Sequence, residues 1–282
     1  MSFTIYTATG CTRCKIIKQL MHERGIAFEE QDMKAEGKEA FQKFYAANRK
    51  AIFRGPDGVE FPLLHDTETG NIHQGIGACV AYLYGGGKLD SFFSVGTLHK
   101  EWVDGIHVSG GNSEYIKGFL EVLRYIKKTN NMKLQLDTNG LNSAILEQIL
   151  AEGLADVMIM NVLGPKELYS QILGKEVDTA EIEKSLSLVS KFPEYKFQTT
   201  VTPVVRGDGE IRYLTTKEVG VAAKLIAEAT GSMKNPYLIK LFKPKECRDE
   251  RFKDIEAMAA DALLPYRTAA RAHQVFVEIE KA

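Results

Sequence analysis

Most of this chain alternates short apolar segments, typical of strands, with longer amphipathic segments, typical of helices. Because consecutive strands separated by helices need crossover connections, the alternation predicts a parallel sheet with helices outside it. Five such units bend naturally into a partial (βα) barrel of TIM-like type, whose site belongs at the carboxyl ends of the strands. The predicted strands cover residues 105–109, 133–137, 157–162, 196–202 and 237–242, and the helices lie near 114–128, 143–152, 179–191 and 215–230.

The first 84 residues show a different pattern of predicted elements, in the order βαβαββα. Three glycines at 85–87 follow, and because glycine holds regular structure at an entropic cost, we expect a domain boundary there. A length of 282 residues also favours two domains. We predict an α/β protein with one domain over 1–84, a Gly-rich linker over 85–97 and the barrel over 98–282. In the first domain the predicted strands are 3–6, 27–32, 59–65 and 71–74, and the helices are 12–24, 36–48 and 78–84.

Charge and hydropathy exclude several classes of function. Thirty-six basic and 37 acidic residues leave a formal net charge of -1, so no overall field attracts nucleic acid or an anionic membrane. Apolar runs stay short of the roughly 20 residues that a spanning helix needs. The opening MSFTIYTATG lacks the basic and then apolar pattern of a secretory leader. We therefore expect a cytoplasmic protein that binds neither nucleic acid nor membrane.

A CxxC motif, Cys11 to Cys14, falls between a predicted strand end and the first turn of a predicted helix. Unpaired backbone N–H groups and the positive end of the helix dipole stabilise a thiolate at Cys11 there. Arg13 and Lys15 add positive charge. Cys14 lies one helical turn further on, within reach to resolve a mixed disulfide. The motif predicts a redox-active disulfide in which Cys11 attacks and Cys14 resolves.

Phe61–Pro62 falls near the start of a predicted strand, where proline is tolerated at an edge or through a cis peptide bond. With the CxxC motif and the βαβαββα order, it makes residues 1–84 resemble a glutaredoxin or thioredoxin-fold redoxin, including the small redoxins that serve ribonucleotide reductase. The resemblance implies a thioredoxin fold with Pro62 as the cis-proline beside the nucleophilic cysteine. It also implies catalytic roles for Cys11 and Cys14, and substrate binding by Gly10, Arg13, Phe61 and Pro62.

The departures from this family bear on the substrate. Thr9 stands where the family usually has a proline before the first cysteine, and Thr12-Arg13 separates the two cysteines. Where glutathione-using members have Gly-Gly followed by Asp, this chain reads Gly75-Ile76-Gly77-Ala78-Cys79. Because the acidic residue is missing, we expect a protein disulfide rather than glutathione as the substrate.

A CxxC pair can also be half of a zinc or iron–sulfur site. Cys79 and Cys247 stand singly in the sequence, which favours redox chemistry over a metal at Cys11 and Cys14. Cys79 lies in an apolar run and is expected to be a small buried hydrophobe. A non-catalytic scaffold, or an iron–sulfur or zinc-binding protein, is the alternative function.

Glycine-rich and polar segments follow several predicted strands of the second domain. In their order and spacing, residues from about 100 to about 250 resemble the radical S-adenosylmethionine (SAM) enzymes, specifically the activating enzymes of pyruvate formate-lyase and anaerobic ribonucleotide reductase. The resemblance implies a barrel that holds a 4Fe–4S cluster through a CxxxCxxC motif and binds SAM. The residues that correspond to its ligand site are Ser109, Gly110, Gly111, Asn112, Asp137, Thr138 and Asn161.

This chain departs from that family at the charged positions. The CxxxCxxC motif has no counterpart in the sequence, and Asn112 stands where the family has the Glu that binds the amino group of SAM. Asn161 and Leu163 replace an Asp and a Lys, and Gln198 replaces an Arg. Because reductive cleavage of a sulfonium needs an electron from a ligated iron atom, we expect no 4Fe–4S cluster, no SAM and no radical activity. The barrel is then a pseudoenzyme domain with a vestigial ligand site.

The predicted function is therefore that of a cytosolic thiol–disulfide oxidoreductase whose silent barrel recognises a partner or ligand. The partner is expected to be a protein disulfide. The resemblances suggest a glycyl-radical enzyme or an anaerobic ribonucleotide reductase. An atypical radical SAM activating enzyme is the second alternative.

Overall fold

The computed structural model describes residues 2–56, 58–98, 100–247 and 249–280. The chain divides into two compact units, one of Met1–Leu136 with Gly153–Ala155, the other of Asp137–Glu152 with Asp156–Ala282. The predicted boundaries at 84 and 98 both fall inside the first unit and stay predictions. Within the described residues, no helix has the length and apolar character needed to cross a membrane.

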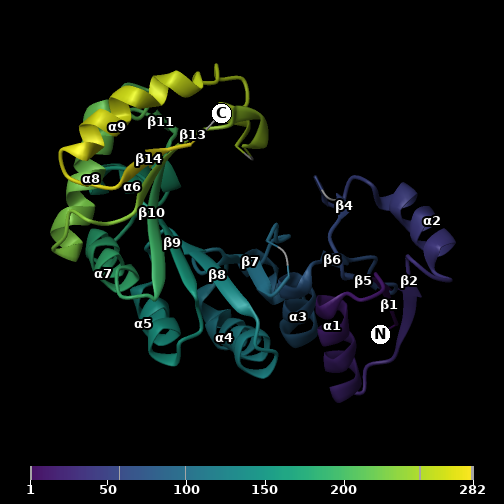
Figure 1. Ribbon diagram of the computed structural model, residues 1–282. Coiled ribbons are helices and arrows are strands. Elements are labelled where there is room, and N and C mark those ends of the chain that lie inside the picture. The colour runs from purple at the N-terminus through teal and green to yellow at the C-terminus, as the bar shows by residue number, and fades with distance from the viewer. Residues whose placement is uncertain (1, 57, 99, 248, 281–282) are drawn as a thin grey trace. The chain divides into compact units, whose positions relative to one another are not determined.

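The first unit contains a four-stranded sheet in the order β2-β1-β5-β6 (Figure 1). Strand β1 (Phe3–Thr7) pairs in parallel with β2 (Phe28–Asp32) and antiparallel with β5 (Leu63–Asp66), which pairs antiparallel with β6 (Ile72–Gln74). The helices and strands follow the predicted order, with one added hairpin. The helices are α1 (Thr12–Glu23), α2 (Lys38–Asn48) and α3 (Ile76–Gly85), and the added hairpin is β3 (Arg54–Gly55) with β4 (Gly58–Val59).

Two apolar faces hold this sheet. On α1 the buried face repeats at helical spacing, with Ile16, Ile17 and Leu20. On the other side an aromatic cluster centres on Tyr6, whose ring stacks on Phe44 at 4.2 Å between centroids. Each fully buried side chain of this kind contributes about 1.5–3 kcal/mol relative to exposure. The packing fixes where β1 ends and α1 begins, which is where the CxxC motif lies.

The segment after α3 differs from the predicted linker. We expected the glycines at 85–87 to interrupt regular structure, but α3 extends to Gly85 and a 3₁₀ helix runs over Gly86–Phe92. The reason is burial, because Leu89 and Phe92 lie in the core and the Phe92 ring stacks on Phe119 at 4.6 Å. Apolar burial here outweighs the entropic cost of the glycines.

A second sheet has six strands in the order β14-β13-β10-β9-β8-β7. The pairs β9–β10, β10–β13 and β13–β14 are parallel, which confirms the predicted parallel sheet of an α/β protein. The sequence missed the last strand, and closure into a TIM-like barrel stays a prediction. The strands are β7 (Trp102–His107), β8 (Lys133–Thr138), β9 (Val157–Asn161), β10 (Glu194–Val201), β13 (Tyr237–Leu241) and β14 (Val277–Ile279).

The helices of this second pattern lie between consecutive strands, and in Figure 1 α5, α7 and α8 follow one another along the outside of the second unit. Helix α8 begins at a capping box, in which the Thr215 side chain and Glu218 satisfy each other's backbone N–H groups. The bounds are α4 (Ile116–Arg124), α5 (Ser143–Glu152), α6 (Tyr169–Leu173), α7 (Thr179–Val189), α8 (Thr216–Thr230) and α9 (Leu264–Arg271), with a hairpin of β11 (Pro203–Val205) and β12 (Ile211–Tyr213).

Candidate functional site

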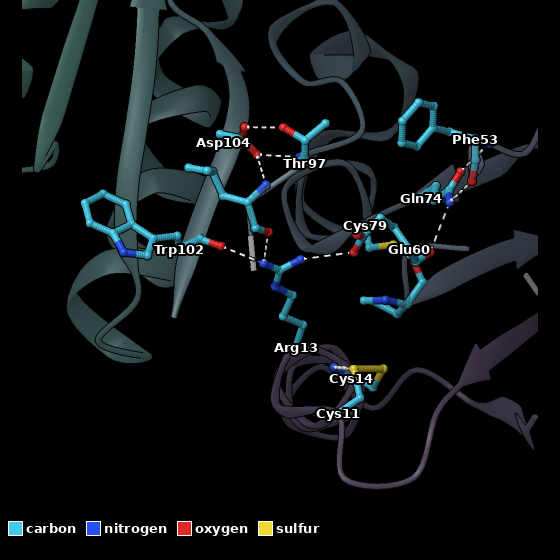
Figure 2. A network of polar contacts seen from close by, with 12 residues as sticks. Cys11, Arg13, Cys14, Phe53, Glu60, Gln74, Cys79, Thr97, Trp102 and Asp104 are labelled. Carbon is cyan, nitrogen blue, oxygen red and sulfur yellow. Dashed lines mark hydrogen bonds and ion pairs between the residues drawn. A yellow bond between two sulfur atoms is a disulfide. The ribbon is translucent and has the colours of Figure 1, made fainter. Parts of the chain in front are cut away.

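The CxxC motif lies where β1 gives way to α1. Gly10, with φ of +80°, allows the chain to turn sharply, and the Cys11 N–H donates to the Ala8 carbonyl at 3.0 Å. Cys11 then caps the helix and is half-buried, whereas Cys14 is 2% exposed. A disulfide joins the two (Figure 2). The first cysteine of the predicted redox pair is therefore the more exposed of the two.

Backbone groups at the start of α1 act directly on the Cys11 sulfur. The Cys14 N–H donates to Cys11 Sγ across 3.1 Å. Hydrogen-bond donors at a helix N-terminus favour negative charge, so the same donor stabilises a thiolate once the disulfide is reduced. This geometry favours Cys11 rather than Cys14 as the nucleophile.

An open pocket of about 590 Å³ lies beside Cys11 within the first unit. Three of the predicted substrate-binding residues, Gly10, Arg13 and Phe61, line it. The fourth, Pro62, is buried, its carbonyl accepts from the Gly75 N–H at 2.8 Å, and the Phe61–Pro62 peptide bond is cis as expected. Substrate binding by these four residues stays a prediction. The remaining lining residues are Ala8, Cys11, Thr12, Val59, Glu60, Lys100, Glu101 and Met132.

Arg13, between the two cysteines, is occupied by contacts within the first unit. Its guanidinium donates to the Trp102 carbonyl at 2.8 Å and to the Leu98 carbonyl, and pairs with Glu60 at 3.4 Å (Figure 2). Its side chain is 11% exposed. Arg13 therefore ties the start of α1 to the segment that carries Lys100 and Glu101, and so fixes one wall of the pocket.

Cys79 is buried in the core of the first unit, as predicted. Its thiol donates to the His73 carbonyl at 3.3 Å, and burial raises the pKa of the thiol well above its usual range. A protonated, enclosed thiol is inert in disulfide exchange. Cys247 lies in the second unit and is half-buried.

Part of the predicted ligand site of the barrel, Ser109 to Asn112, belongs to the first unit. A Cβ on Gly110 would lie 2.2 Å from the Ser91 carbonyl oxygen, and a Cβ on Gly111 would lie 2.1 Å from the Phe92 ring. Close packing of the 3₁₀ segment therefore accounts for both glycines. The Asn112 side chain accepts from the Glu114 N–H at 3.0 Å. A ligand role for these residues stays a prediction.

The other part, Asp137, Thr138 and Asn161, belongs to the second unit. There the Gln198 side-chain amide donates to Asn161 Oδ1 at 2.6 Å, and the Asn161 amide donates to the Thr138 carbonyl at 3.5 Å. Thr138 is buried, and its Oγ1 accepts from the Gly140 N–H at 3.0 Å. The two neutral amides, which stand where the resemblance leads one to expect charged residues, thus hydrogen-bond to each other.

Comparison with known proteins finds a distant relative of this chain. No family model matches the chain. Over 160 residues the chain is 26% identical to a putative glycyl-radical enzyme activating enzyme from Methanocaldococcus jannaschii. The match covers 55% of this chain, which spans 61% of the length of that relative. It supports the radical SAM part of the predicted resemblance.

The same match overturns one expectation. We expected no 4Fe–4S cluster and no SAM, and a relative named as an activating enzyme contradicts this, because resemblance to that class implies both groups. The donors do not fit a cluster, however. Across the described ranges, His, Cys, Asp and Glu side chains form no group of three placed to hold a metal ion. Of the four cysteines, two form the disulfide and one is buried in the first unit.

Sequence reasoning missed the far wall of the Cys11 pocket. Lys100, Glu101 and Met132 line it, although they lie far along the chain from the CxxC motif. Nothing in the local sequence around these residues signals the motif they face. Glu60 could have been found, because it precedes Phe61–Pro62 directly.

Proposed function

We propose that this chain is a thiol–disulfide oxidoreductase, built on a thioredoxin-like arrangement of its four-stranded sheet, in which Cys11 attacks and Cys14 resolves. One observation carries the proposal: the Cys11–Cys14 disulfide lies at a helix N-terminus on the wall of an open pocket. The order and directions of β2-β1-β5-β6 support the fold assignment.

The reaction proceeds by two exchanges at sulfur. In the reduced protein the Cys11 thiolate attacks one sulfur of the substrate disulfide, and the other sulfur leaves as a thiolate that takes a proton from water. The Cys14 thiol loses its proton and attacks Cys11 Sγ, which forms the internal disulfide and releases the second substrate thiol. The substrate gains two electrons and two protons, and an external dithiol returns the protein to the reduced state.

The backbone supports both steps. The Cys14 N–H, 3.1 Å from Cys11 Sγ, stabilises the attacking thiolate and the same sulfur when it becomes the leaving group. Because Cys14 is 2% exposed, a substrate entering the pocket meets Cys11 first. The order of attack follows from this difference in exposure.

We further propose that the substrate is a protein disulfide and that the second unit recognises the protein that carries this disulfide. The relative's name denotes an activating enzyme of glycyl-radical enzymes, which supports a glycyl-radical enzyme as the partner class for this chain. An anaerobic ribonucleotide reductase is the alternative partner, and this alternative is based on the sequence resemblance alone.

Reduction of a protein disulfide such as insulin, with dithiothreitol as the electron source, tests the proposal. We expect Cys11→Ser to lower the rate by about 100-fold or more, because no other sulfur replaces the nucleophile. Cys14→Ser should instead accumulate a mixed disulfide at Cys11, visible by mass spectrometry. Cys247→Ser is the matched control and should keep the wild-type rate. Equal rates in all four proteins would eliminate the proposal.

The similarity to an activating enzyme favours a second candidate function, in which the predicted barrel activates a glycyl-radical enzyme. The donor set described above does not fit a cluster, so we assign no step to one. Anaerobic reconstitution with iron and sulfide separates the candidates. Stoichiometric iron that survives in the Cys11→Ser, Cys14→Ser double variant would support activation. Iron lost in that variant would instead make the CxxC pair a metal ligand.

A further inference from the structure

Phe53 is an apolar side chain left in solvent directly before the β3–β4 hairpin, whose Val59 lines the Cys11 pocket. It is 42% exposed, whereas its neighbour Ile52 is 5% exposed and joins the aromatic core. Among the described residues of the first unit, it is the one large apolar side chain that is this exposed. Single exposed apolar residues are common, so exposure alone assigns nothing to Phe53.

The backbone of Phe53 is held at both ends by one buried side chain. The Phe53 N–H donates to Gln74 Oε1 at 2.8 Å, and the Gln74 amide donates to the Phe53 carbonyl at 2.8 Å (Figure 2). The same amide donates to the Glu60 carbonyl at 3.0 Å. Gln74 is 4% exposed, and a buried amide that lost these partners would be costly. Phe53 and Glu60 are therefore locked into one surface.

This surface is continuous with the Cys11 pocket. Phe53 is followed directly by β3, whose Arg54 pairs with Val59 on β4, and Val59 lines the pocket. The Phe53 ring lies over the hairpin, 3.5 Å from the position of a Cβ on Gly55. The residues that line the pocket, within the described ranges, do not include Phe53. A small disulfide that fills the pocket would not touch it, but a chain that continues along the hairpin would.

We propose that Phe53 is a specificity-determining residue for the disulfide exchange: the substrate is a polypeptide disulfide that extends from Cys11 along the β3–β4 hairpin and places an apolar side chain on the Phe53 ring. The inference rests on the proposed function and names its substrate class. Burial of apolar surface supplies the preference, and the rigid mount keeps the ordering cost of Phe53 low.

Matched peptide disulfides test this role. Two disulfide-linked peptides differ only in one residue that flanks the cysteine, Leu in one and Ser in the other. We expect the wild type to reduce the Leu peptide with a kcat/KM about ten-fold higher than that of the Ser peptide. Phe53→Ala should bring the ratio close to one, and Phe53→Leu should keep most of it.

Two controls make the outcome specific. All variants should reduce 2-hydroxyethyl disulfide at the wild-type rate, because this substrate is too small to extend from the pocket to residue 53. Ile211→Ala, at an equally exposed apolar residue of the second unit, should keep the wild-type peptide ratio. An active protein whose peptide ratio is unchanged in Phe53→Ala, or whose rates fall equally for all three substrates, would overturn the inference alone. A wild type inactive on every disulfide would overturn the proposed function as well.

Discussion

The two regions that carry sequence motifs use their polar groups in opposite ways. At the CxxC turn, Cys11, the proposed nucleophile, lines an open pocket, and Arg13 donates to backbone carbonyls beside it. In the second unit, Asn161 at the end of β9 and Gln198 within β10 hydrogen-bond to each other. The first region leaves the Cys11 side chain accessible from a pocket, whereas in the second region the two amide side chains are hydrogen-bonded to each other.

The difference shows how a site is distinguished from a motif. A motif gives residue types and spacing, but a site also needs supporting groups that leave the reactive atom accessible. Around Cys11 the helix N-terminus, the Arg13 contacts and the pocket meet this requirement. We therefore place the chemistry of the proposed function at the CxxC turn.

Among the variants that test this comparison, those that remove the Arg13 contacts should lower the free energy of unfolding most. Arg13→Ala removes one ionic partner of Glu60 and the guanidinium that donates to two carbonyls, so we expect the free energy of unfolding to fall by about 2–3 kcal/mol. Arg13→Lys should recover little, because one ammonium cannot span the three acceptors. Urea denaturation of the three proteins measures the effect. A loss smaller than about 0.5 kcal/mol would show that the contacts do not hold the pocket wall.

A smaller effect is expected in the second unit. Gln198→Ala removes the donor to Asn161 Oδ1, and we expect a loss of about 1 kcal/mol in the free energy of unfolding. Asn161→Ala should cost a similar amount, and the double variant should cost less than the sum, since the two residues share one hydrogen bond. Additive losses in this double-mutant cycle would contradict a hydrogen bond between the two side chains.

The smallest effect is expected from acid, which should lower the stability of the protein through His73 of the first unit. Burial lowers the pKa of His73, more than the nearby carboxylates of Asp90 and Asp66 raise it. The folded state therefore keeps His73 neutral, while the unfolded chain takes up a proton near pH 6.5. Stability conferred by neutral His73 is complete above that pH and is lost as the pH falls below it. The free energy of unfolding, measured from pH 8 to 5, should decline on the acid side.

The variant His73→Phe isolates this contribution. The His73 ring stacks on Tyr82 at 3.8 Å, and its buried Nε2 has no hydrogen-bond partner among the described residues, so a phenyl ring gives up only the Nδ1 contact to Asp90 at 3.7 Å. We expect the variant to flatten the decline in part. It keeps His65, whose pKa is also lowered by burial and which contributes in the same direction. An acid-side slope as steep as that of the wild type would remove His73 as the cause.

Local sequence was enough to place the CxxC turn. A strand end, a glycine and a helix start lie within ten residues, and each is governed by neighbours in the chain. The burial of Cys79 followed from its apolar run in the same way. Predictions failed where distant segments decide. Met132 reaches the pocket through tertiary packing, which no spacing rule describes.

The glycines illustrate the second limit. Gly110 and Gly111 were assigned to the predicted ligand site of the barrel, and in the structure Ser91 and Phe92 pack closely against them. The sequence shows that glycine stands at both positions, and it does not show which group fills the space beside them. The last strand and α9 were missed because both are short, with three and eight residues, and their apolar periodicity is too brief to detect.

A redox titration with mass-spectrometric readout tests the central claim most directly. The protein is equilibrated in buffers of graded thiol to disulfide ratio, and free thiols are alkylated and located by peptide mapping. The account predicts that Cys11 and Cys14 lose their thiols together, with the two-electron dependence of about 30 mV per tenfold change, while Cys79 stays unreacted in the folded protein. Alkylation of Cys11 and Cys14 that does not depend on the redox buffer would contradict it.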